Sequence, residues 1–246
     1  FFILLFNSSV HSETLLENLG VGLPAINVSD NPAGETTYSL SLQILALMTV
    51  LTVLPSLILG MTSFTRIIIV LSILRQAMGT QQTPPNQVLI AVALFLTLFI
   101  MSPTLSKINN NALSPYLNGD LPAEKAISSA SNIMKDFLVY NTRKNDLQMF
   151  ADLAGDEKYE SNYEVPLPVI LPAFITSELK TAFQIGFLLF LPFLVIDMVI
   201  ASTLMSLGMM MLSPMLVSLP FKLLLFVLVD GWAMTVGSLV ATYSSS

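Results

Sequence analysis

The sequence contains no cysteine and only one histidine, His11, among its 246 residues. Without cysteine the chain has no thiol nucleophile, no disulfide and no thiolate ligand for a metal. His11 falls in an N-terminal segment that we expect to be removed, which excludes a Ser-His-Asp triad and a histidine-ligated zinc. We therefore expect no enzyme: no catalytic residue, no metal site and no cofactor.

Charge is also scarce, because charged residues make up 11% of the chain and hydrophobic residues 54%. The mean hydropathy is +0.75. This composition excludes a disordered chain and does not fit an ordinary soluble domain, whose surface needs more charged side chains. The net charge of -6 argues against nucleic acid as a partner, since phosphate binding needs a basic surface.

What the sequence has instead is long apolar stretches, each reaching the ~20 residues that cross a bilayer. A backbone away from water must satisfy its own hydrogen bonds, so each stretch is expected to be helical. The predicted fold class is an all-α membrane protein with two long kinked helical hairpins, bent at Pro55 and Pro192. The four stretches are Leu40–Leu59, Asn86–Leu105, Thr181–Leu207 and Pro220–Val240.

The hairpins are separated by a polar block that carries helical periodicity between Ile127 and Tyr140. We interpret it as a small helical insert outside the cytoplasm, the alternative being a solvated linker. The apolar start is interpreted as the remnant of a signal peptide, the alternative being an ordinary apolar N-terminus. The predicted segments are residues 1–12 (signal-peptide remnant), 13–39 (polar lead-in), 40–106 (first hairpin), 107–165 (insert) and 166–246 (second hairpin with a methionine-rich loop).

Orientation follows from Arg66 and Arg75 in the connector Gly60–Pro85, which contains no acidic residue. The positive-inside rule places this connector in the cytoplasm and the insert on the other side. On this interpretation the two arginines act as topology determinants. The segment Phe64–Leu74 is too apolar for a solvated loop, so we expect it to pack on protein or to lie at the membrane interface.

Three long motifs of unusual composition stand out: the run Met61–Gln87, the run Pro172–Gly186, and Gly208–Met211 followed by Leu219–Lys222 and Val229–Trp232. They resemble the FliP family of flagellar export proteins. The resemblance covers about residues 40–240 and favours the flagellar branch over the homologous virulence-type secretion systems.

The resemblance implies a core subunit of the flagellar type III export gate, the channel for unfolded flagellar proteins during flagellum assembly. It implies several copies of the chain, five in our expectation, together with the Q and R subunits of the gate. Further expected partners are other export-apparatus and basal-body proteins, the unfolded export substrates and membrane lipid. The expected location is the basal body in the bacterial inner membrane, with part of the chain on the periplasmic side.

Five of the thirteen methionines lie within residues 205–215. Methionine is flexible and apolar, so a ring of such side chains can seal a pore and re-pack around a passing polypeptide. We predict that Met209, Met210 and Met211 form this seal, the alternative being ordinary core filling. The resemblance likewise assigns the loop to a channel constriction.

Three charged residues, Asp197, Lys222 and Asp230, interrupt the apolar stretches, where an unpaired charge is costly. They indicate pairing between subunits or proton handling, or else one ion pair within the protomer. Asp197 and Asp230 are equidistant from the Ser213–Pro214 bend. Lys222 precedes Asp230 by eight residues, about 12 Å of helix, so we expect it to reach neither aspartate. A neighbouring subunit would then supply the cation.

Glu178 and Lys180, at the edge of the third stretch, are further candidates for pairing between subunits. Two other function classes remain as alternatives. A proton or ion channel would be built around Asp197 and Asp230. An aspartyl intramembrane protease is disfavoured, because Asp230-Gly-Trp lacks the Gly-x-Gly-Asp pattern of one such family.

Overall fold

The computed structural model describes residues 29–30, 36–37, 40–80, 82–155, 159, 164–209 and 211–244. The predicted signal-peptide remnant and most of the polar lead-in lie outside these residues. The chain divides into two compact units, residues 1–57 and 58–246, and each is described by itself.

The first unit contains a short β-ribbon and most of helix α2. Strand β1 (Ser29–Asp30) pairs antiparallel with β2 (Thr36–Thr37), with Ser29 opposite Thr37. Helix α2 (Leu40–Gly60) is apolar on every side, and all its residues from 44 to 57 are exposed. A helix of this kind is typical of a segment that is covered by lipid or by a larger assembly.

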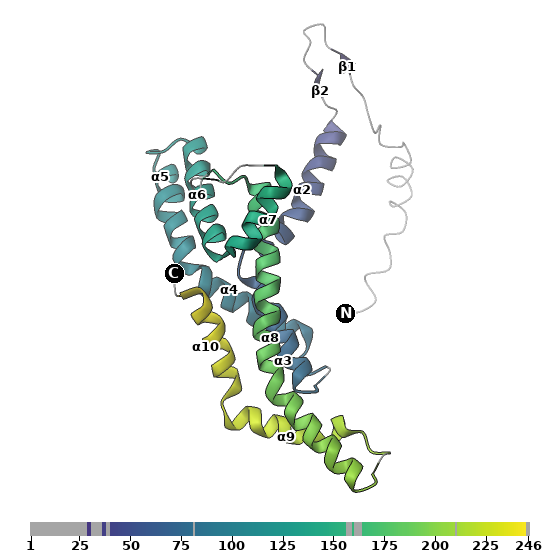
Figure 1. The fold of residues 1–246 in the computed structure, drawn as a ribbon. Helices are drawn as coiled ribbons and strands as arrows, with labels where there is room; N and C mark the ends of the chain where they lie inside the picture. Colours follow the sequence, from purple (N-terminus) through teal and green to yellow (C-terminus); the bar gives the residue numbers. More distant parts are fainter. Residues whose placement is uncertain are drawn as a thin grey trace, which may run out of the picture. The chain divides into compact units, whose positions relative to one another are not determined.

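The second unit is organised around α8, a helix of 40 residues that is about 60 Å long at ~1.5 Å per residue (Figure 1). It continues through Pro172 and Pro192. The elements of this unit are α3 (Phe64–Ala77), α4 (Asn86–Ile108), the π-helix η1 (Asn109–Leu113), α5 (Ser114–Leu117), α6 (Ala123–Asn141), α7 (Lys144–Ala154), α8 (Leu167–Ser206), α9 (Pro214–Leu228) and α10 (Gly231–Ser244).

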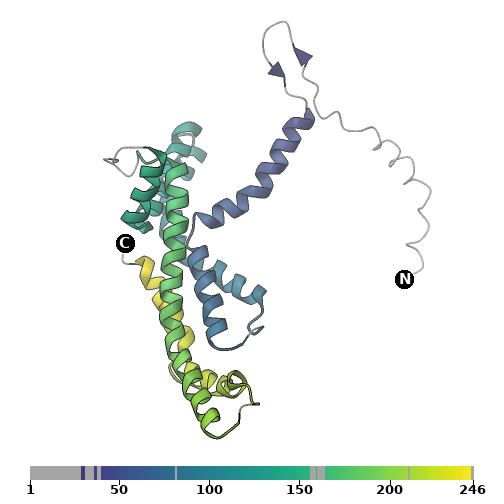
Figure 2. The ribbon, with the colours of Figure 1, turned by 45° about the vertical axis from the view of Figure 1, so that its right-hand side comes forward.

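Helix α3 runs parallel to α8 and supplies much of the core of this unit (Figure 2). Contacts advance together along both helices, from Arg66 against Glu178 to Ile73 against Gly186. The buried cluster joins α3, α4, α8 and α10 through Ile67, Val70, Leu71, Leu89, Ala93, Ala182 and Leu239. The prediction that the apolar connector packs on protein is therefore confirmed.

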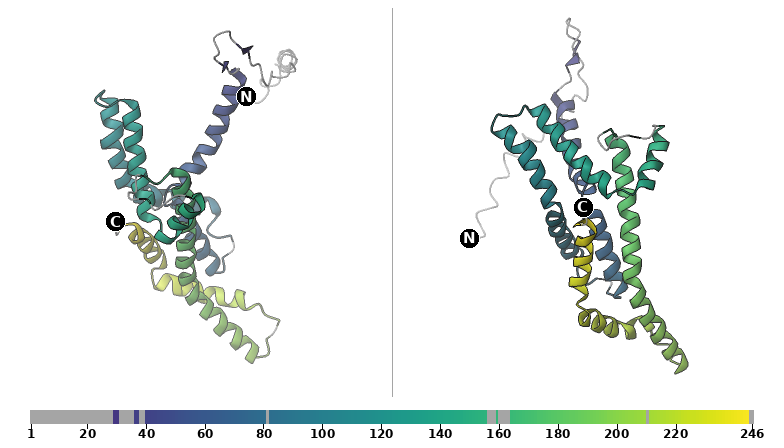
Figure 3. Two further views of the ribbon diagram at one scale, coloured as in Figure 1. Left: turned by 45° about the horizontal axis from the view of Figure 1, so that its top comes forward. Right: turned by 60° about the vertical axis from the view of Figure 1, so that its left-hand side comes forward.

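The insert is helical, as its periodicity predicted, and lies at the start of α8. Helix α6 packs beside η1 and α5, and α7 packs on α8 (Figure 3). Leu138 of α6 shares a buried cluster with Ile170 and Phe174 of α8. The two ends of the predicted apolar stripe, Ile127 and Tyr140, are exposed instead.

The fourth apolar stretch consists of two helices and not of one. Helix α9 runs antiparallel to α8, since Phe226 packs on Phe193 and Lys222 lies against Asp197. The axes of α9 and α10 then differ by 62°. Helix α10 returns toward the insert, where Tyr243 stacks on Phe137 of α6. We call the break at Val229–Gly231 the elbow.

Two described helical segments are long and apolar enough to cross a membrane, Asn86–Leu117 and Leu167–Ser206. The number rises to four if each of two broken helix pairs counts as one span. These pairs are Ile44–Gly60 with Phe64–Ala77, and Pro214–Leu228 with Gly231–Tyr243. The all-α prediction with long apolar helices is confirmed.

Candidate functional site

The turn between α8 and α9 presents methionine side chains to the outside of the chain. Gly208 ends α8 with a φ of 74°, in the left-handed region that glycine enters without strain. Met209 is 47% exposed and Met211 fully exposed. Met210 lies outside the described residues. Because these side chains lack a core of their own to fill, they are available to a partner, to lipid or to a passing chain.

An ion pair between a buried lysine and a half-buried aspartate lies nine residues before the end of α8. Lys222 Nζ of α9 is 2.6 Å from Asp197 Oδ2 and donates to the carbonyl oxygen of Ala77 at 3.1 Å. Ser218 Oγ donates to the other carboxylate oxygen at 2.6 Å. The Lys222 side chain is 3% exposed. This cluster joins α3, α8 and α9 directly behind the methionine turn.

The expectation that Lys222 would be out of reach of Asp197 is therefore wrong. That expectation assumed that Ser213–Pro214 is the middle of the hairpin, whereas the turn between α8 and α9 occupies residues 207–213. Asp197 precedes Ser206 by nine residues, and Lys222 follows Pro214 by eight. The two residues are therefore level across the turn, and the alternative of an ion pair within the protomer holds for them.

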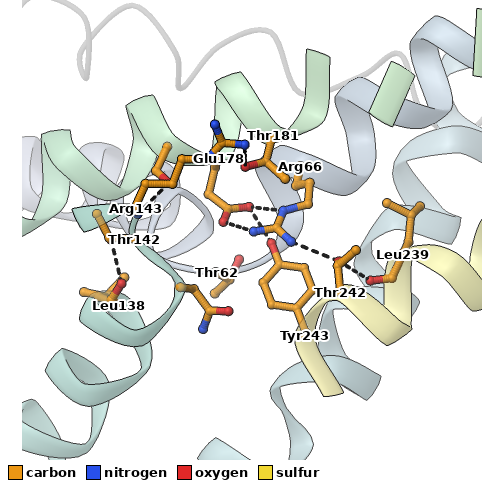
Figure 4. Close-up of polar contacts among 12 residues, drawn as sticks. Thr62, Arg66, Leu138, Thr142, Arg143, Glu178, Thr181, Leu239, Thr242 and Tyr243 are labelled. Atoms are coloured by element: carbon orange, nitrogen blue, oxygen red, sulfur yellow. Dashed lines mark hydrogen bonds and ion pairs between the residues drawn. The ribbon is translucent and has the colours of Figure 1, made fainter. Parts of the chain in front are cut away.

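A second buried cluster forms where α3, α8 and α10 meet (Figure 4). Arg66 Nε donates to Glu178 Oε2 at 2.8 Å, and its Nη2 donates to Oε1. Arg66 Nη1 donates to Thr242 Oγ1 at 2.9 Å, and the Tyr243 hydroxyl donates to Glu178. The guanidinium carbon lies 4.0 Å from the centre of the Tyr243 ring. The carboxylate thus has two cationic N–H donors and one hydroxyl donor.

This cluster corrects the expected roles of two residues. Arg66 is 4% exposed and is no loop arginine at a membrane surface. Glu178 is fully buried and meets its partners within the protomer, so it is not open to a neighbouring subunit. Removing one member would leave the other charge buried without a partner, which costs about 3–5 kcal/mol. Both residues therefore act first as structural elements of this chain.

The remaining candidates lie on the surface. Lys180 Nζ is 3.8 Å from Asp146 Oδ1, and its side chain is 52% exposed. Asp230, in the elbow, is exposed and has a φ of 49°, the one left-handed non-glycine residue in the described part of the chain. The described residues offer its carboxylate no hydrogen-bond or ion-pair partner.

Sequence reasoning missed Thr242, Tyr243 and Ser218, which complete the two clusters. A search for opposite charges at the ends of apolar stretches would have paired Arg66 with Glu178. No sequence signal predicts that Thr242 or Tyr243 contacts this ion pair. They reach Arg66 and Glu178 only because the elbow turns α10 back toward them. Among the described residues, no group of three acidic or histidine side chains is placed to hold a metal ion.

Comparison with known proteins places most of the chain within one family. The sequence model of the FliP family matches residues 47–239. A protein of Cereibacter sphaeroides called flagellar biosynthetic protein FliP is 73% identical over 222 residues, covering 90% of this chain and 73% of that protein. The protein of the same name from Bacillus subtilis (strain 168) is 51% identical over 218 residues, covering 89% and 98%. That of Pectobacterium carotovorum is 52% identical, covering 91% and 86%.

Proposed function

Because the chain belongs to the FliP family, we propose that it is a core subunit of the flagellar type III protein export gate. In this role it transports protein and catalyses no reaction. The match over residues 47–239, which includes every helix from α3 to α9, carries the proposal. The relatives named above are all called flagellar biosynthetic proteins, which favours flagellum assembly over a virulence-type secretion system.

The gate is proposed to contain several copies of this chain, five in our expectation, together with the Q and R subunits. The apolar surface of the single chain supports an assembly, because exposed leucine, phenylalanine and methionine side chains cover α2, α4, α8 and α9. An apolar surface of this extent marks contact with lipid or with other subunits. We place the assembly in the bacterial inner membrane, at the flagellar basal body.

The insert and the end of α10 are proposed to face the periplasm. Tyr243 stacks on Phe137 of the insert, so both belong to one end of the second unit. The methionine turn lies at the other end of α8. Arg66 no longer supports this orientation because it is buried, and Arg75 alone remains as a topological signal.

Met209, Met210 and Met211 are proposed to close the channel between export events. The exposure of Met209 and Met211 supports this role over core filling. The pairing of Asp197 with Lys222 speaks against an ion pathway that uses Asp197 and Asp230 together, since one of the two carboxylates already has a cation.

The export function is tested in a strain that lacks this chain. Flagellar proteins should disappear from the culture medium and motility should be lost, and both should return with the wild-type chain. Continued secretion of flagellar proteins without the chain would refute the proposal.

The seal is tested by replacing the three methionines with glycine. Leakage of small ions should rise because glycine removes the apolar side chains, while the gate still assembles because the change lies in a turn. Replacement of the same three residues by leucine is the matched control, since it keeps apolar bulk and should keep the seal. Unchanged conductance in an assembled glycine variant would reduce these methionines to packing.

A further inference from the structure

Most charges on the long helices of the second unit find a partner within the chain. Arg66 pairs with Glu178, Lys222 with Asp197, and Lys180 with Asp146. Asp230 and Arg75 do not pair with an opposite charge among the described residues. Arg75 donates from Nη1 to the Pro84 carbonyl at 3.1 Å and to Asn86 Oδ1 at 2.6 Å, and meets no carboxylate there.

Asp230 is exposed in surroundings that do not suit a charge. Leu228 beside it is 74% exposed, and Trp232 is 41% exposed. An unpaired carboxylate on an apolar surface is costly wherever lipid or protein covers that surface. The family membership and the apolar exterior both imply that lipid or other subunits cover this surface. The carboxylate therefore needs a cation from outside its own chain.

The elbow holds this carboxylate in a fixed place. A Cβ on Gly231 would lie 2.2 Å from the Phe226 ring, so the chain there is packed as tightly as glycine allows. The ring edge of Phe226 also meets Trp232, with 5.5 Å between centroids. Asp230 keeps a left-handed backbone that few residues other than glycine, asparagine and aspartate adopt. A rigid elbow can dock without the entropy cost of ordering a loop.

Arg75 lies at the same level as the elbow but on another face. Phe226 packs in a cluster with Leu74, Ala77 and Met78, which recur at three or four residues and form one face of α3. The opposite face of α3 borders a hollow of about 670 Å³, lined by Ile68, Ile69, Ile73, Arg75 and Gly79, with Met215 of α9. The hollow is mainly apolar, and Arg75 is its one charged residue.

We propose that the elbow of one copy docks into the hollow on α3 of a second copy, where Asp230 pairs with Arg75. Leu228 and Trp232 would cover the isoleucine side chains around that ion pair. The two surfaces differ, so the contact is head-to-tail, and repetition of such a contact gives a ring when the rotation between copies closes. Lys107 in the last turn of α4, Lys125 in α6 and Lys144 in α7 also meet no carboxylate among the described residues, but they belong to the insert or to its end of α4 and so lie at the wrong level. The proposal rests on the proposed function, which requires several copies.

Cross-linking between differently tagged copies tests the contact directly. The chain has no native cysteine, so Gln76→Cys in the lining of the hollow of one copy and Leu228→Cys beside Asp230 in the other give one thiol each and keep both charges. A short bismaleimide applied to the assembled gate in membranes should join the two tags. A copy with Asn118→Cys, in the turn after α5, is the matched control and should not join to Gln76→Cys. Equal yields from the two pairs, or no product from the first, would overturn the proposal.

Charge variants test the energetics. Asp230→Asn keeps the size and the left-handed backbone but removes the charge, so dissociation of the detergent-purified oligomer should begin at a protein concentration at least about tenfold higher. Arg75→Gln should do the same, and Arg75→Gln combined with Asp230→Asn should lose no more than either single variant, because both substitutions remove the same ion pair. Asn86→Ala removes one of the two contacts of Arg75 within its own chain and should leave the oligomer intact.

These experiments distinguish failure of the docking contact from failure of the proposed export function. Wild-type assembly of Asp230→Asn, or losses that add up in the double variant when both single variants insert normally, would refute the contact while export could continue. A wild-type chain that purifies only as a monomer and is dispensable for flagellar export would refute the proposed function itself.

Discussion

Replacing Gly186 with alanine tests the close approach of α3 and α8. A Cβ at this position would lie 2.4 Å from Ile73 Cδ1, 3.0 Å from its Cγ2 and 3.2 Å from its Cβ. Rotation of the isoleucine side chain can move the first of these atoms away. It cannot move the Cβ, which is fixed to the α3 backbone. The helices must therefore separate, or the core around Ile73 must re-pack.

The magnitude follows from two opposing effects. Overpacking of a well-packed core costs about 1–3 kcal/mol, and the three contacts at Ile73 place Gly186→Ala in the upper half of that range. Alanine gains up to about 1 kcal/mol over glycine within a helix. The sum is a loss of about 1–2 kcal/mol of unfolding free energy. For a chain of this size that lowers Tm by roughly 2–8 °C.

Gly237 of α10 provides the matched control, because nothing lies within 4 Å of a Cβ placed there. Gly237→Ala should keep the helix-propensity gain without the clash and so raise Tm slightly. The assay is thermal unfolding of the detergent-purified chain, followed by circular dichroism. Ile73→Ala removes the two closest atoms, Cδ1 and Cγ2, and keeps the Cβ, so combining it with Gly186→Ala should give a favourable coupling of about 1–2 kcal/mol. Equal Tm values for the two glycine variants, or strict additivity with Ile73→Ala, would refute the argument.

Further predictions follow from the buried cluster, the elbow and the orientation. Glu178→Gln should lower the unfolding free energy by about 3–5 kcal/mol, since it leaves Arg66 buried without a counter-charge, and replacing both by methionine should cost less. Gly231→Ala should open the elbow to limited proteolysis, because its Cβ would overlap the Phe226 ring; an unchanged cleavage pattern would contradict this. A cysteine at Asn118 should react with an impermeant maleimide from the periplasm, and labelling only after the cytoplasm is opened would reverse the proposed orientation.

Composition and the length of the apolar stretches were sufficient to predict long helices, because both depend on local properties of the chain. The starts of α2 and α4 were placed at the observed residues, Leu40 and Asn86. Helix α8 begins at Leu167, earlier than the predicted Thr181, because its first turns pack on the insert and not in an apolar span. Only tertiary contacts such as those of Phe174 with Leu138 show this.

The partners of charged residues could not be predicted, because they depend on how helices turn back. Lys222 meets Asp197 because the turn between their helices occupies seven residues and not a single bend. Arg66 meets Thr242 because the elbow at Asp230 redirects α10, and the sequence Val-Asp-Gly-Trp shows no such break by its hydropathy. A bend between the third and fourth apolar stretches was the easier inference, since Gly208 and Pro214 mark it in the sequence.

The cluster around Glu178 also has a consequence for the order in which the chain is made. Arg66 and Thr242, which both belong to it, are 176 residues apart. A ribosome that adds about 5–20 residues per second needs roughly 10–35 seconds between them. During that interval the arginine of α3 has no carboxylate until Glu178 emerges and no hydroxyl partner until later still. The buried cluster that joins α3, α8 and α10 is therefore complete only once α10 has been made, so the last helix of the chain finishes the packing of α3.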